Sequence, residues 1–94
     1  MKKNSGQELW SKAKKLIPGG NSLLSKRPEM YLPEIWPAYY KNAKGCVITD
    51  LDDNKYHDMS VMGLGTNVLG YANDEIDQEV IAAVRDGNMS TLNC

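Results

Sequence analysis

The sequence lacks two features that would point directly to a partner: an excess of charge of one sign and a long apolar run. Its 11 basic and 12 acidic residues leave a formal net charge of −1. That balance gives no general attraction to nucleic acid or to an anionic membrane. No apolar run approaches the ~20 residues of a membrane span, and no apolar segment follows the opening Met-Lys-Lys-Asn as in a signal peptide. We therefore expect no nucleic-acid partner, no membrane partner and a cytoplasmic location.

Cysteine and histidine are also scarce, with two cysteines and one histidine in 94 residues. Cys46 and Cys94 are too far apart for a C-x-x-C metal or redox motif. A zinc site with a single imidazole would need carboxylates as its remaining ligands. Without an export signal, both thiols are expected to be reduced.

What the chain does contain is an α+β order of elements, which begins with a helix. Ser5 and Glu8 form an S-x-x-E capping box, so we predict a helix over about 5–17 with Ser5 at its N-cap. Pro18-Gly19-Gly20 ends it. Its apolar stripe is Leu9, Trp10, Ala13, Leu16 and Ile17. The following residues, 21–37, have no period but carry prolines among large apolar groups, which favours an extended crossing over a surface.

Residues 38–59 predict a three-stranded antiparallel meander. A first strand is expected over 38–43, an alternating β-branched strand over 46–51 and a return strand over 55–59. Asp52-Asp53-Asn54 supplies the turn between the last two. The carboxylates of this region lack the ligand spacing of a calcium loop, and turn formation accounts for them.

A glycine-punctuated apolar segment and a second helix complete the order. We interpret residues 59–72, with Gly63, Gly65 and Gly70, as a segment that lies under another part of a larger protein. Asn73 or Asp74 is expected to cap a helix over about 74–86, with Gly87 as its stop. The apolar face of this helix is Ile76, Val80, Ala83 and Val84.

None of these patterns is an active site by itself. His57 alternates along a strand and has no nucleophile in a recognisable context, which favours a structural or surface role. The run GLGTNVLG lacks the strand-to-helix order and the third glycine of a dinucleotide fingerprint.

The order of motifs resembles the amino-terminal part of the class III pyridoxal-phosphate aminotransferases. The resemblance is carried by Pro18-Gly19-Gly20, Asn21-Ser22, the hairpin motif from Gly45 to Asp58, Leu69-Gly70-Tyr71, and the helix from Asn73 to Gly87. The PGG-NS element is most similar to the glutamate-1-semialdehyde 2,1-aminomutase branch. Asp53 stands where the family usually has a turn glycine, and Tyr71 where it usually has a histidine.

The resemblance implies that residues 1–94 are a truncated amino-terminal segment of a fold type I transferase. In the family, the Schiff-base lysine, the phosphate loop and the acidic partner of the pyridine nitrogen lie beyond the matched region. The complete enzyme would move an amino group through a lysine-bound aldimine of pyridoxal 5'-phosphate, while this segment alone would be inactive and hold no cofactor. Its partners would be the rest of the enzyme, a homodimer mate and a small amino or keto substrate.

The resemblance also implies substrate contacts. Ser22 would face the substrate pocket, with Arg27 or Lys26 receiving a carboxylate, and Leu64 stands nearest to a family tryptophan. A solvated loop is the other interpretation of the Ser22–Arg27 region. The second functional hypothesis is a stand-alone α+β interaction module without catalysis. For the isolated segment we expect no specific pyridoxal-phosphate binding, and association or loosening through uncovered apolar patches.

Overall fold

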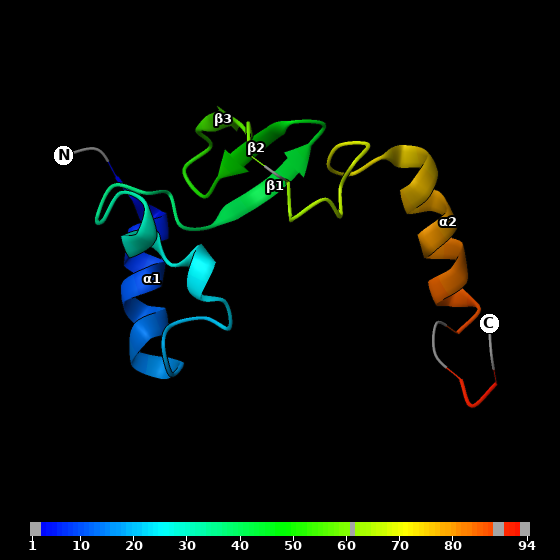
Figure 1. The fold of residues 1–94 in the computed structure, drawn as a ribbon, viewed down its shortest axis with the longest axis horizontal. Helices are drawn as coiled ribbons and strands as arrows, with labels where there is room; N and C mark the ends of the chain where they lie inside the picture. The colour runs from blue at the N-terminus through cyan, green and yellow to red at the C-terminus, as the bar shows by residue number, and fades with distance from the viewer. Residues whose placement is uncertain (1–2, 61, 88–89, 93–94) are drawn as a thin grey trace.

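The computed structural model describes residues 3–60, 62–87 and 90–92, and shows two helices joined through a three-stranded sheet (Figure 1). The elements, in chain order, are α1 (Ser5–Leu16), 3₁₀ turns at Leu24–Lys26 and Pro28–Met30, β1 (Tyr40–Lys44), β2 (Val47–Asp50), β3 (Lys55–His57) and α2 (Asp74–Arg85). The strands pair antiparallel in the order β1-β2-β3. The predicted α+β order, with its meander and two helices, is therefore confirmed.

The start of α1 differs from the predicted capping box. Its N-cap is Asn4, whose side-chain oxygen accepts a hydrogen bond from the Gln7 N–H at 3.1 Å. Ser5 is instead the first helical residue, and its N–H and hydroxyl both donate to the carboxylate of Asp52. The prediction of Ser5 at the N-cap is wrong because a carboxylate from a distant turn takes the free donors at the helix start.

The small core lies where α1 meets residues 24–37. Trp10 is 3% exposed, and Pro28 is fully buried. Gly6 lies so close to Pro37 that an added Cβ would be 1.7 Å from the Pro37 carbonyl oxygen. The helix therefore packs on this segment through its smallest and its largest side chains.

The segment 21–37 is not the extended crossing that its prolines suggest. It forms two 3₁₀ turns, and Pro28 occupies the first turn of the second one. That position needs no N–H and suits the fixed φ of proline, so the prolines here start turns instead of holding an extended chain. The rings of Tyr31 and Trp36 stack with their centroids 4.5 Å apart.

The meander has the predicted turn between β2 and β3, and residues 45–46 connect β1 to β2. Lys44 pairs with Val47 across this connection, and Ile48 with Tyr56 across the second pair of strands. Asp53 in the β2–β3 turn has a φ of +63°, in the left-handed region that glycine adopts most easily. A glycine would adopt this backbone with less strain than Asp53 does.

α2 has no covering element within the described residues. Asn73 caps it as predicted, with its side-chain oxygen accepting from the Ile76 N–H at 3.2 Å, and none of its residues is buried. Two backbone hydrogen bonds between Gly45 and Tyr71, at 2.9 and 2.8 Å, join the chain before α2 to the sheet. The Tyr71 hydroxyl also donates to the Asp58 carboxylate.

The molecule is elongated, with principal extents of 50 × 29 × 20 Å. Its radius of gyration is 16.4 Å, whereas a compact domain of this length has about 12 Å. In Figure 1, α1 and α2 lie at opposite ends and both extend from the sheet toward the same side. Over the described residues, neither helix is long and apolar enough to cross a membrane.

Candidate functional site

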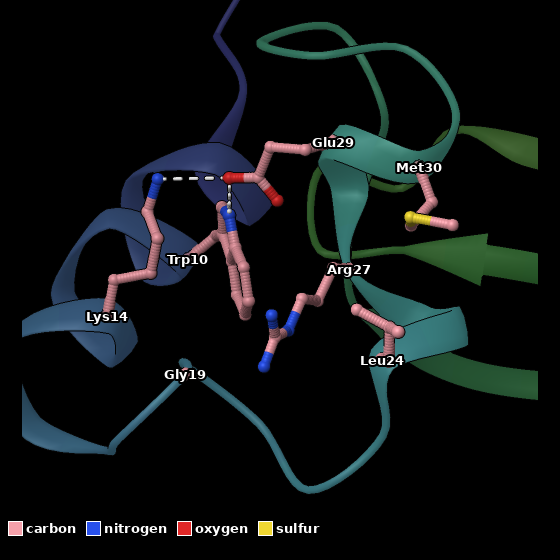
Figure 2. A pocket seen from close by; sticks show the side chains of 7 residues that line it. All are labelled: Trp10, Lys14, Gly19, Leu24, Arg27, Glu29 and Met30. Atoms are coloured by element: carbon pink, nitrogen blue, oxygen red, sulfur yellow. Dashed lines mark hydrogen bonds and ion pairs between the residues drawn. The ribbon is translucent and has the colours of Figure 1, made fainter.

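A hollow of about 420 Å³ opens between the end of α1 and the 3₁₀ turns. Figure 2 shows the residues that line it: Trp10, Lys14, Gly19, Leu24, Arg27, Glu29 and Met30. It combines apolar walls with two cations and one carboxylate, a composition that suits a small polar ligand.

The carboxylate of Glu29 is held in place by the helix. It accepts hydrogen bonds from the Trp10 indole N–H at 2.8 Å and from Lys14 Nζ at 3.1 Å. The bond from Trp10, then its own backbone N–H, and also Lys14 lower the pKa of Glu29 to about 2. Glu29 is therefore ionised at neutral pH, and it orients the Trp10 ring.

Arg27 is a cationic side chain that lines the hollow. Its Nε atom is buried without a hydrogen-bond partner among the described residues. Figure 2 shows its guanidinium directed toward Gly19 and the Trp10 ring. Because a guanidinium presents donors in a planar fork that matches a carboxylate, Arg27 is the best-placed group here to receive one.

The two glycines after α1 make this arrangement possible. A Cβ on Gly19 would lie 2.5 Å from Arg27 Nη2, and one on Gly20 would lie 2.4 Å from the Trp10 ring. The sequence predicts Pro18-Gly19-Gly20 as a helix stop and as a family motif, but it does not predict the contacts of these glycines with Arg27 and Trp10, or the contribution of Glu29. The second glycine was the sequence signal for this close packing, because a single glycine is sufficient to end a helix.

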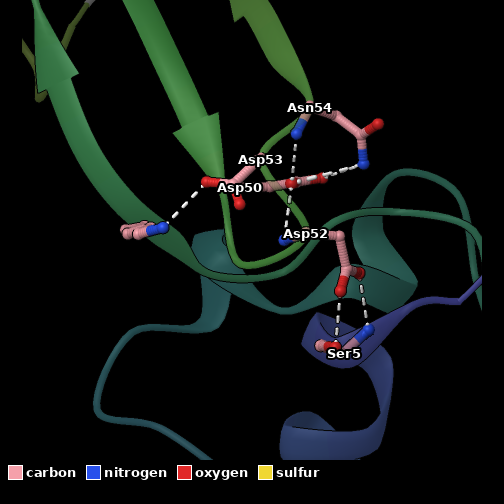
Figure 3. Close-up of polar contacts among 6 residues, drawn as sticks. Ser5, Asp50, Asp52, Asp53 and Asn54 are labelled. Atoms are coloured by element: carbon pink, nitrogen blue, oxygen red, sulfur yellow. Dashed lines mark hydrogen bonds and ion pairs between the residues drawn. The ribbon is translucent and has the colours of Figure 1, made fainter.

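A second polar cluster lies in the β2–β3 turn (Figure 3). Asp50 is 5% exposed, and its carboxylate accepts from the N–H groups of Asp52 and Asn54, both at 2.9 Å, and from the Tyr56 hydroxyl at 3.1 Å. Burial raises the pKa of Asp50, but these hydrogen bonds outweigh it and hold the pKa below its usual value. The acceptor sites of Asp50 are occupied by the turn itself.

Asp52 extends this cluster to α1 through Ser5, with the Ser5 N–H at 2.8 Å (Figure 3). The same two donors from Ser5 lower the pKa of Asp52. Among the described residues, no three His, Cys, Asp or Glu side chains are grouped to hold a metal ion. The cluster thus acts as a structural link between the hairpin and the first helix.

The sequence-predicted site residues are not brought together. Arg27 lines the hollow, while Ser22 and Lys26 are exposed and do not line it. Leu64 is 81% exposed. The loop that carries it lies between the sheet and α2, away from the hollow beside α1 (Figure 1). His57 is exposed on β3.

The described residues do not by themselves fit pyridoxal phosphate. A Schiff-base lysine must lose its proton readily, which burial promotes, yet every described lysine is exposed. A helix N-terminus can hold a phosphate, but the Asp52 carboxylate occupies that of α1. The first turn of α2 carries Asp74, Glu75 and Asp77, which repel an anion.

No protein-family model matches the chain, but known proteins match most of it. It is 35% identical over 78 residues to a 3-aminobutyryl-CoA aminotransferase from Cloacimonas acidaminovorans, covering 83% of this chain and 18% of the relative. It is 36% identical over 84 residues to a glutamate-1-semialdehyde 2,1-aminomutase from Methanococcoides burtonii, covering 89% and 18%. An omega-transaminase from Sphaerobacter thermophilus superposes with a TM-score of 0.80 at 25% identity, over 97% of this chain and 19% of that one.

These matches establish the class of protein to which the fold belongs, that of the pyridoxal-phosphate-dependent transferases. The chain belongs to the class III aminotransferase family, within which glutamate-1-semialdehyde 2,1-aminomutases are among its relatives. It spans about a fifth of the length of those relatives.

Proposed function

We propose that residues 1–94 are the amino-terminal segment of a pyridoxal-phosphate-dependent aminotransferase or aminomutase, in which they form one wall of the substrate entrance and part of the subunit interface. The observation that carries the proposal is the superposition of 97% of this chain on 19% of a transaminase at a TM-score of 0.80. Sequence identities of 35% and 36% to an aminotransferase and an aminomutase support it.

In this proposal the cofactor site comes from the rest of the enzyme. Pyridoxal phosphate supplies the electron sink that amino-group transfer needs. The exposed lysines of this chain do not provide the attachment site. What the segment contributes is recognition, because the cationic Arg27 side chain lines an open hollow. We assign to Arg27 the binding of a substrate carboxylate. Ser22 and Leu64 do not line the hollow, and we propose them as substrate contacts of the complete enzyme only through the family resemblance.

A chimera tests the assignment. The matching segment of the Methanococcoides burtonii protein is replaced by this chain, and aminomutase activity is measured with added pyridoxal phosphate. We expect a folded chimera that binds the cofactor and turns over substrate. A chimera that folds and binds the cofactor but is inactive contradicts the proposed function.

The same chimera tests the substrate residues. Replacing Arg27→Ala removes a charge-assisted pair and should raise KM by about tenfold or more, and Ser22→Ala by about two- to tenfold. Lys26→Ala, which removes an exposed cation outside the hollow, is the matched control and should leave KM within about twofold. Equal KM values for all three variants would place Ser22 and Arg27 outside the substrate site.

A stand-alone interaction module is the second candidate, and the uncovered apolar face of α2 is the observation that favours it. This function requires no cofactor. A chimera that folds but lacks both cofactor binding and turnover would favour it over the first candidate.

A further inference from the structure

Arg27 and Glu29 line the same hollow and carry opposite charges, yet they are not paired with each other. They lie on either side of Pro28, which is fully buried. A carboxylate is the group that a guanidinium binds best, so the two side chains attract each other. Within the described residues, Glu29 forms its ion pair with Lys14, and Arg27 takes part in no ion pair. Another contact therefore keeps the two charges apart.

The donors on α1 account for this separation. The Trp10 indole N–H and Lys14 Nζ both donate to the same oxygen of Glu29, Oε1, at 2.8 and 3.1 Å. Figure 2 shows the Glu29 carboxylate held at the indole N–H, while the Arg27 guanidinium is directed toward Gly19. The two charged groups are thus turned to different parts of the hollow.

The Trp10 side chain is itself fixed by packing. It is 3% exposed, and an added Cβ on Gly20 would lie 2.4 Å from its ring. A side chain packed this closely does not move to follow a partner, so its N–H stays in one place. These contacts join α1 to the second 3₁₀ turn of the same chain, and they do not depend on which surfaces are exposed.

We propose that Trp10 is a positioning residue, which keeps Glu29 from pairing with Arg27 and so leaves the Arg27 guanidinium for a substrate carboxylate. The proposal rests on the proposed function, since it takes Arg27 as the group that binds the substrate. Trp10 acts through Glu29. Without the indole N–H, the Glu29 carboxylate competes with the substrate for Arg27.

Steady-state kinetics of the chimera described above test this competition. Trp10→Phe keeps an aromatic ring but removes the N–H donor. We expect KM to rise about two- to fivefold, as for one exposed ion pair that competes for Arg27, with a smaller change in kcat. Adding Glu29→Gln removes the competing charge and should return KM to within about twofold of the unmodified chimera. A role of Trp10 in packing alone gives no such recovery, because Glu29→Gln does not restore the lost volume.

The Arg27→Ala chimera separates an effect through Arg27 from a direct one. In that background Trp10→Phe should change KM by less than about twofold. Lys14→Met removes the other donor to Glu29 from an exposed position, so it repeats the test without altering the core. It should raise KM about two- to fivefold when Arg27 is present, and by less when it is absent. Lys15→Met makes the same change on an exposed lysine outside the hollow and is the matched control.

The outcomes distinguish this proposal from the proposed function. If neither Trp10→Phe nor Lys14→Met raises KM, if Glu29→Gln gives no recovery, or if the increases are equal with and without Arg27, the positioning role is wrong although Arg27 still binds the substrate. If Arg27→Ala itself leaves KM unchanged, the substrate role of Arg27 is wrong, and the positioning role is overturned with it. Far-UV circular dichroism checks that each variant keeps its helices.

Discussion

Gly20 satisfies two constraints at once. Its φ is +80°, and an added Cβ would lie 2.4 Å from the Trp10 ring. The first constraint disfavours any side chain on backbone grounds, and the second leaves no room for one. We predict that Gly20→Ala lowers the free energy of unfolding by about 2–4 kcal/mol, the sum of the left-handed backbone penalty and overpacking. Urea denaturation followed by tryptophan fluorescence measures the loss.

Gly65 provides the control for this prediction. Its φ is +81°, almost the same, but nothing lies within 4 Å of its added Cβ. Gly65→Ala should therefore lower the free energy of unfolding only by the backbone penalty, about 1 kcal/mol. If the two variants lose equal stability, the close approach to Trp10 contributes nothing.

At the residue scale, the sequence predicts what is decided locally. The Asn73 cap was predictable because the cap and the N–H it receives are three residues apart. The Ser5 cap was not, since the competing carboxylate of Asp52 is 47 residues away. Arg27 was predicted only through the family resemblance, and its neighbours Trp10 and Glu29 were missed because nothing in their spacing shows that they meet.

At the scale of elements, Asp52 joins α1 to the hairpin. Asp52→Asn keeps the shape of the side chain but removes the charge and one of the acceptors that receive the two Ser5 donors. We predict that this change lowers the free energy of unfolding, because the two Ser5 donors lose a charged acceptor. Asp53→Asn makes the same chemical change on an exposed turn residue whose carboxylate pairs with Lys41, and should lower the free energy of unfolding by less than Asp52→Asn does. Equal effects on chemical denaturation would show that the link to Ser5 is not stabilising.

The elements themselves were predictable to different degrees. The meander followed from alternation and from Asp52-Asp53-Asn54, both of which are local signals. The segment 21–37 was predicted as extended because it has no period. Its 3₁₀ turns accompany the packing of Pro28 and Trp36 beside α1, where Gln7 Nε2 donates to the Trp36 carbonyl at 2.6 Å. The periodicity of the sequence does not predict that contact.

At the scale of the whole molecule, carboxylates with lowered pKa values make stability depend on pH. Hydrogen bonds lower the pKa of Glu29 to about 2 and also lower those of Asp52 and Asp58. These groups bind protons more weakly in the folded chain than in the unfolded one, so their contribution is present above about pH 4.5 and is lost as the pH falls toward 2. We predict that the urea midpoint falls steadily over this range.

Stability is also expected to fall at high pH. The hydrogen bond donated to Asp58, then burial, raise the pKa of Tyr71 to about 12. Because the folded chain holds this proton more tightly, its contribution is lost as the pH rises from about 10 to 12. Tyr71→Phe should reduce this loss, and it should also weaken the Asp58 part of the loss at acid pH, because the Tyr71 hydroxyl is the main cause of the lowered pKa of Asp58. A wild-type midpoint that is higher at pH 3 than at pH 6 would contradict the acid part of the prediction.

The whole-molecule shape was the least predictable feature. The sequence shows an amphipathic second helix, and a half-buried helix is the ordinary expectation for such a pattern. In the structure, no residue of α2 is buried. Amphipathicity identifies the face that needs a partner, but not whether the same chain supplies one.

The contacts of α1 have a consequence for the order in which the protein forms during synthesis. Its hydrogen bonds reach the Ile35 and Trp36 carbonyls, Glu29 and, farthest along the chain, Asp52. Among the described residues, the hydrogen-bond partners of this helix all precede α2 in the chain and are synthesised before it. Since chains emerge amino-terminus first, the α1–hairpin unit can assemble on the ribosome while the later residues are still being translated. The hydrogen bonds of α1 therefore need no residue of α2, and they can form before α2 folds.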